Sequence, residues 1–101
     1  MNLVQILLPL FDNVGRRIAR RKFDAVRCEL TERFGGLTAY PRAPAEGWWR
    51  TPHRTQRDDI VVVEIMVARV DAAWWCRYRA LLERRFRQQH IVIRSQSMRQ
   101  L

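Results

Sequence analysis

The sequence contains few of the residues that build metal, disulfide or nucleophile sites. It has two cysteines, Cys28 and Cys76, and two histidines, His53 and His90. The cysteines form no C-x-x-C pair, and neither histidine has a cysteine or carboxylate neighbour at metal-ligand spacing. No serine or cysteine lies in a nucleophile motif, and no glycine-rich phosphate loop is present. We therefore expect no metal, no cofactor and two free thiols, and free thiols favour a reducing compartment.

Long apolar runs are also missing. No run approaches the ~18 residues needed to span a bilayer, so we expect no membrane segment. Residues 3–11 are apolar, but no basic residues precede them and no small-residue cleavage site follows, as a secretion signal requires. We interpret this stretch as a strand and expect a cytoplasmic protein.

Acidic residues are few beside basic ones. The 101-residue chain has 19 basic and 10 acidic residues, a formal net charge of +9, and Lys22 is its only lysine. The preference for arginine over lysine has two explanations, coding bias in a GC-rich genome or a functional basic surface, and the charge alone does not decide between them. The 48% share of hydrophobic residues nevertheless predicts a folded chain. The length predicts a single domain over residues 1–101, with an ordered core at about 3–94 and a polar tail at 95–101.

The hydrophobic pattern predicts six elements in the order β-α-β-β-α-β. The predicted strands cover residues 3–10, 37–40, 60–67 and 90–94. Prolines interrupt the second strand, which resumes at 48–50. The predicted helices cover 22–34, ended by Gly35, and 71–88, with Asp71 as the N-cap. This order is that of the ferredoxin-like α+β fold, a four-stranded antiparallel sheet of strand order 4-1-3-2 with both helices on one face.

Alternation along the strands separates two faces of the predicted sheet. One face is apolar and forms the predicted core beneath the helices: Val4, Ile6, Leu8, Leu10, Val61, Val63, Ile65, Val67, Ile91 and Ile93. The opposite face carries Gln5, Glu64 and Arg94 on three neighbouring strands, together with His90. Apolar residues surround them: Leu3, Leu7, Ile60, Val62, Met66 and Val92. An exposed apolar patch of this size typically marks a contact surface.

Two interpretations of this open face stand side by side. In the first, the faces of two copies pack in a homodimer, with Glu64 paired to Arg94 of the same or the other chain. In the second, the face lines a small-molecule pocket of the dimeric α+β-barrel kind. Glu64 would then act as acid or base, while Gln5, His90 and Arg94 place a polar ligand. We favour the first, a homodimeric binding or interaction module with no catalysis assigned.

Basic residues offer a third interpretation, a nucleic-acid-binding accessory protein. Four arginines cluster in a predicted loop and three lie on the polar side of the second helix: Arg16, Arg17, Arg20, Arg21, Arg77, Arg84 and Arg87. Aromatic and basic residues also alternate around the second strand: Tyr40, Arg42, Trp48, Trp49 and Arg50. The first and third strands are aliphatic, whereas the RNA-binding version of this fold carries aromatic residues there. This difference weakens the interpretation.

Several short motifs resemble those of a group of small bacterial proteins of unknown function. The chain carries Phe-Gly-Gly-Leu-Thr at 34–38, Glu-Gly-Trp at 46–48 and Phe-Arg-Gln at 86–88, before the last predicted strand. The resemblance covers most of residues 23–94 and is consistent with the ferredoxin-like fold, but it implies no activity. Many members of the group are secreted or lipid-anchored, and we expect this chain to belong to a cytoplasmic branch. The shared pattern singles out Thr38, Trp48 and Gln88.

Overall fold

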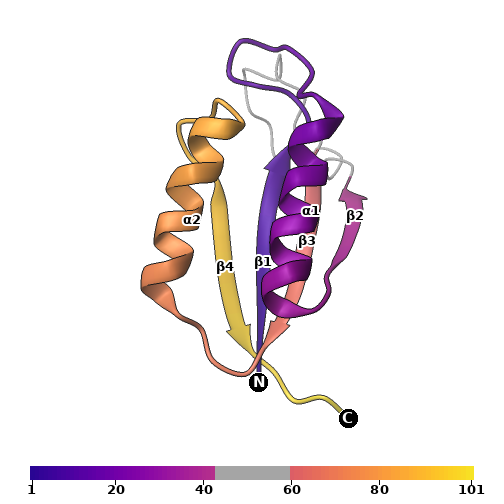
Figure 1. Cartoon of the computed structure of the whole chain (residues 1–101), viewed down its shortest axis with the longest axis vertical. Coiled ribbons are helices and arrows are strands. Elements are labelled where there is room, and N and C mark those ends of the chain that lie inside the picture. Colours follow the sequence, from indigo (N-terminus) through magenta and orange to yellow (C-terminus); the bar gives the residue numbers. More distant parts are fainter. Residues whose placement is uncertain (43–59) are drawn as a thin grey trace, which may run out of the picture.

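The computed structural model describes residues 1–42 and 60–101. The elements are β1 (Asn2–Pro9), α1 (Arg20–Phe34), β2 (Thr38–Arg42), β3 (Ile60–Val67), α2 (Ala72–Arg85) and β4 (Val92–Ser97). The strands form one antiparallel sheet of order β2-β3-β1-β4. Both helices lie on one face of this sheet (Figure 1). The predicted ferredoxin-like α+β fold is therefore confirmed, including the strand order.

The core lies between the sheet and the two helices. Alternate side chains of β1 and β3 point toward the helices and are buried, as period-two alternation predicts. The buried cluster is Val4, Ile6, Leu8, Ile18, Val26, Leu30, Val63, Ile65, Val67, Trp75, Tyr78, Leu82, Phe86 and Ile91. Val61 and Ile93 pack against it only partly buried. Each large apolar side chain removed from water in this way stabilises the fold by about 1.5–3 kcal/mol.

The helix boundaries differ from the predicted ones at two ends. α1 begins at Arg20, so Arg20 and Arg21 belong to its first turn and not to a loop. α2 ends at Arg85, three residues early, because Arg87 adopts a left-handed conformation with φ 52°. The amide of Gln88 then donates to the carbonyl of Glu83 at 2.9 Å, a pattern that closes helix C-termini. Glycine is the usual residue at such a position, since an L side chain there costs about 1–2 kcal/mol.

The last strand is shifted toward the C-terminus. It covers Val92–Ser97 and not 90–94, so residues 95–97 belong to the sheet and His90 does not. β4 pairs with the edge of β1 as far as Asn2, which lies opposite Ser97. Hydrogen bonds between strand backbones do not require apolar side chains. The polar composition of residues 95–97 therefore misled the prediction of a tail.

The second strand is an edge strand that contains Pro41. An edge position tolerates proline because the missing N–H can face away from the sheet. The predicted continuation at 48–50 and His53 lie outside the described residues.

Candidate functional site

Four residues stand side by side across the sheet face that the helices leave open. The register places Glu64 opposite Thr38 and Gln5, and Gln5 opposite Arg94. We call Thr38, Glu64, Gln5 and Arg94 the polar row. No described helix or strand covers this face (Figure 1). The prediction that Gln5, Glu64 and Arg94 share one face of neighbouring strands is confirmed.

Gln5 links the two charged residues of the polar row. Its Nε2 donates to Glu64 Oε2 at 2.7 Å, and its Oε1 accepts from Arg94 Nε at 2.9 Å. The Tyr40 hydroxyl donates to the same Glu64 oxygen at 3.2 Å. Because β1 separates β3 from β4, Glu64 and Arg94 are two strand spacings apart, roughly 9.5 Å, and form no direct pair within the chain. The polar row thus has a negative end at Glu64 and a positive end at Arg94.

Apolar residues flank the polar row on both sides. The neighbouring line across the strands toward the C-terminal end of β1 consists of Tyr40, Val62, Leu7 and Val92. The line on the other side consists of Met66, Leu3 and Gln96. Met66 is 42% exposed and Val92 is 37% exposed, which is high for apolar side chains in strands. Val62 is 2% exposed, so the prediction that it belongs to the exposed patch is wrong.

His90 was expected on this face, and the structure does not bring it there. His90 is exposed beside Glu83, with Nδ1 3.6 Å from Oε2, because it precedes β4. Gln88 has a structural role, since its side chain donates to the carbonyl of Phe11 at 2.9 Å. Trp48 lies outside the described residues. Of the described positions that the shared motifs single out, Thr38 lies in the polar row and Gln88 does not.

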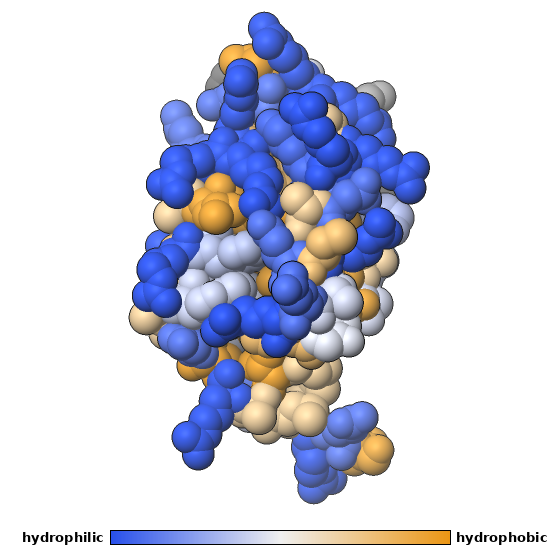
Figure 2. All heavy atoms as spheres, in the orientation of Figure 1, coloured by the Kyte–Doolittle hydropathy of each residue, from blue (hydrophilic) through white to orange (hydrophobic). Residues whose placement is uncertain are grey.

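The structure brings two basic segments, more than 60 residues apart in the sequence, to one end of the molecule. The amide of Asn13 donates to the carbonyl of Arg87 at 3.2 Å, which joins the loop after β1 to the turn after α2. Hydrophilic side chains cover this end, at the top of the view (Figure 2). We call its exposed arginines the basic end: Arg16, Arg17, Arg20, Arg21, Arg84 and Arg87. Arg77 is not part of it, because seven residues of α2 place it about 10 Å from Arg84 along the helix axis.

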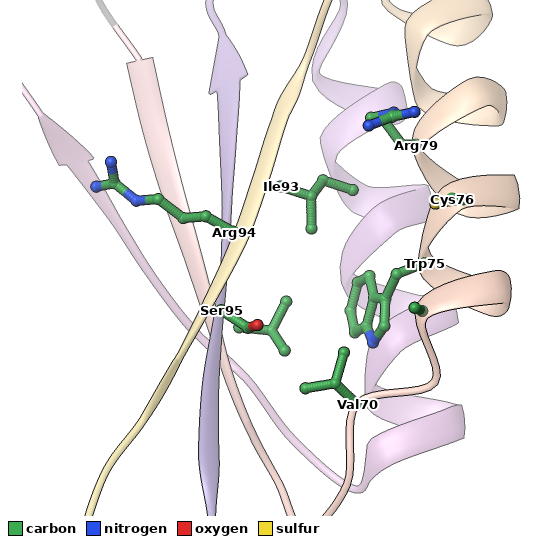
Figure 3. A pocket seen from close by; sticks show the side chains of 9 residues that line it. Val70, Trp75, Cys76, Arg79, Ile93, Arg94 and Ser95 are labelled. Carbon is green, nitrogen blue, oxygen red and sulfur yellow. The ribbon is translucent and has the colours of Figure 1, made fainter.

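A pocket of about 170 Å³ lies between α2 and β4, on the helix side of the sheet. Val70, Trp75 and Ile93 form apolar walls, and Arg79 and Cys76 line it from α2 (Figure 3). The side chain of Arg94 points away from this pocket, toward the other side of the sheet (Figure 3). Arg94 is among the residues that line the pocket, but because its side chain points to the other side of the sheet, the pocket and the polar row lie on opposite sides of it.

A charged cluster between the two helices was not predicted. Arg85 of α2 holds Glu29 of α1 through two hydrogen bonds of 2.7 and 2.8 Å, and the Tyr78 hydroxyl donates to Glu29 at 2.9 Å. The hydrogen bonds from Arg85, followed by the one from Tyr78, lower the pKa of Glu29. Burial and the neighbouring carboxylate raise the pKa of Tyr78. No spacing within either helix indicates this cluster, because its members come from different elements.

The Glu29 cluster predicts a specific acid sensitivity. A carboxyl whose pKa is lowered by folding stabilises the protein above its unfolded pKa, near 4.5, and this contribution disappears as the pH falls through the lower folded value. Glu29→Gln should therefore lower the free energy of unfolding at pH 7 by about 1 kcal/mol, since Glu29 is 40% exposed and screened. It should also flatten the decline in stability below about pH 4.5. Urea titrations across pH 2.5–7 measure both effects.

Glu32→Gln is the matched control for this prediction. Glu32 is an exposed glutamate on the same helix, without a hydrogen bond or ion pair among the described residues. We expect its substitution to leave the acid limb of the stability profile unchanged. Equal acid limbs for Glu29→Gln and the wild type would contradict the role of the cluster.

The part of the chain that the structure describes contains no group of three or more histidine, cysteine, aspartate or glutamate residues that could hold a metal ion. Over residues 1–42 and 60–101, no helix is long and apolar enough to cross a membrane. Both cysteines are free and exposed.

Comparisons with protein-family models, with curated proteins and with solved structures found no match to this chain. The likeness to the group of small bacterial proteins thus stays a prediction from sequence motifs, and what is established at this point is the ferredoxin-like topology.

Proposed function

We propose that this chain is a homodimeric binding or interaction module in which the open sheet faces of two copies pack against each other. The observation that carries the proposal is the polar row, an ordered chain of hydrogen bonds from Glu64 to Arg94 between two largely apolar lines, on a face that no described helix or strand covers. Two sheets that pack face to face lie about 10 Å apart, which side chains of this length can bridge. The two exposed free thiols favour a reducing compartment, and we expect a cytoplasmic location.

The hydrogen bonds of the polar row leave complementary groups unused. Arg94 donates to Gln5 through Nε, so its terminal Nη groups have no partner among the described residues. A carboxylate accepts about four hydrogen bonds. Those described for Glu64, from Gln5 and Tyr40, both reach Oε2. A second copy can satisfy both needs, since an Arg94 from one chain suits a Glu64 from the other.

The charges select one geometry for the pair. A two-fold axis roughly parallel to β1 and passing near Gln5 reverses the row in the second copy, so that Glu64 of each chain faces Arg94 of its partner. A two-fold axis along the row would instead place each charged residue of one chain opposite the same residue of the other chain. Like charges would then meet, which costs several kcal/mol. The same axis lets the apolar lines of the two chains meet.

Light scattering after size exclusion tests the proposal. At micromolar concentration we expect a mass twice the 12.1 kDa of one chain. Met66→Glu should shift the equilibrium to the monomer, because each dimer then buries two new unpaired carboxylates. Val14→Glu is the matched control, since Val14 is 67% exposed on the loop after β1, away from the open face, and should leave the dimer intact.

A wild-type protein that stays monomeric up to about 100 µM would overturn the proposal, because stable interfaces of standard size bind far more tightly. If that monomer bound small polar molecules through Arg94 and Glu64, the pocket interpretation of the face would replace the dimer.

A further inference from the structure

The structure points to a second binding surface, and we propose that the basic end binds the phosphate backbone of double-stranded nucleic acid. Its six exposed arginines come from two chain segments that meet only in the fold. Among the described residues, none of the six forms an ion pair with a carboxylate. Guanidinium groups bind phosphate oxygens in a bidentate manner and keep their charge at every physiological pH.

The arginines are held on ordered backbone. The carboxylate of Asp12 accepts hydrogen bonds from the amides of Val14 and Arg16 at 3.0 and 2.8 Å, and Ile18 pairs with Leu10 across the base of the loop. These amides lower the pKa of Asp12, and the charges of Arg16 and Arg87 add to the effect. The hydrogen bond from the amide of Asn13 to the carbonyl of Arg87 holds the two segments together. A ligand would meet arginines already gathered, with a small ordering cost.

Two features of the basic end reduce the stability of the free protein. The first turn of α1 contains Arg20, Arg21 and Lys22 and no acidic residue, and Ala19 gives no side-chain cap. Positive charges at a helix N-terminus oppose the helix dipole. Arg87 holds a left-handed conformation that glycine would adopt without strain. A bound polyanion compensates the first feature, and the second retains an arginine side chain where the fold alone would favour glycine.

The chemistry of this end favours a duplex backbone over unpaired bases or a membrane. The two segments expose no large aromatic side chain, so they offer no stacking surface for single-stranded bases. They expose one large apolar side chain, Val14, which gives little apolar area for insertion into a lipid interface.

Fluorescence anisotropy with a labelled random duplex of about 20 base pairs tests the proposal. Between about 50 and 200 mM NaCl, six phosphate contacts should give a slope of roughly −5 in log K against log salt. Arg20→Ala/Arg21→Ala should reduce the slope by about 2 and weaken binding roughly tenfold. The helix should fold at least as well, because the removed charges oppose its dipole.

Arg69→Ala/Arg99→Ala is the matched control. It removes the same charge at the opposite end of the sheet, where hydrogen bonds join Asn2 to Ala68 and Met98 to Met1. We expect its affinity to stay within about twofold of the wild type. Equal losses for the two double variants would show that net charge alone drives binding, and would overturn the assignment to the basic end.

Arg87→Gly separates binding from folding. It should raise the midpoint of thermal unfolding, because glycine relieves the left-handed strain, and yet weaken duplex binding. Unchanged duplex affinity would remove Arg87 from the site. Tighter binding to vesicles of acidic phospholipid, or to a single strand of the same length, than to the duplex would overturn the choice of ligand. The dimer is tested separately by its mass, so failure of the dimer and failure of duplex binding are distinguishable.

Discussion

Replacing Glu64 with arginine is expected to dissociate the proposed dimer, with at least a roughly 100-fold rise in its dissociation constant. The two-fold axis places Glu64 of one chain against Arg94 of the other, so Glu64→Arg creates two repulsive contacts in each dimer. Like charges brought together at an interface cost several kcal/mol, which makes this the largest effect expected on association. Sedimentation equilibrium across a range of concentrations measures the change.

The reciprocal exchange makes the prediction specific. Arg94→Glu alone should weaken the dimer by a similar amount, whereas Glu64→Arg with Arg94→Glu should restore much of the affinity, because each contact again joins opposite charges. Both single variants should stay folded, since Glu64 is half-buried and Arg94 is exposed. If the double variant associates no better than the single ones, the two residues do not face each other and the proposed axis is wrong.

The same axis has a consequence for the basic end. A two-fold rotation about an axis parallel to β1 leaves the strand direction unchanged, so the ends of both chains where α1 begins would lie on the same side of the dimer. Two basic ends on one side double the number of arginines available to one duplex, and a linked pair binds more tightly than either part alone. The dimer and the duplex-binding surface are compatible in this geometry.

The fold could be predicted from the local sequence, because the hydrophobic periodicity of a helix or strand repeats along each element. Ile60–Val67 is rich in β-branched residues and follows two aspartates in the sequence, and its observed bounds equal the predicted ones. Asp71 caps α2 through the amide of Trp74, as its position before an apolar helical stripe predicts. The predicted end of a strand was wrong where pairing with a neighbouring strand determines it. β4 extends to Ser97 because β1 offers it a partner.

For the open face, the sequence predicts only which side of the sheet each strand residue lies on. Period two places Gln5, Glu64 and Arg94 on one side, and the 4-1-3-2 order makes their strands neighbours. The central place of Gln5 depends on strand register, because it requires Glu64 and Arg94 to lie opposite the same residue. The junction of the two basic segments depends on tertiary hydrogen bonds, such as that from Asn13 to Arg87, which no periodicity reveals.

Replacing Phe86 with alanine is expected to cause the largest loss of stability, about 3–5 kcal/mol in the free energy of unfolding. Phe86 is fully buried, and its ring meets the ring of Phe23 edge to face at 5.2 Å, which joins the end of α2 to the start of α1. Truncation removes this contact and leaves a cavity that the two helices cannot fill without shifting toward each other. Domains of this size have a total stability of about 5–15 kcal/mol, so the variant retains little margin.

Urea denaturation of Phe86→Leu and Val14→Ala, measured beside Phe86→Ala, separates the loss of buried volume from the general effect of a substitution. Leucine keeps most of the volume and should lose a smaller part, while Val14→Ala at an exposed loop position should stay within about 0.5 kcal/mol of the wild type. Phe86 also anchors the turn whose Arg87 carbonyl accepts the amide of Asn13. Hydrogen exchange at Asn13 should therefore accelerate in Phe86→Leu by more than its global stability explains. If exchange there follows global stability alone, the basic end does not depend on this anchor.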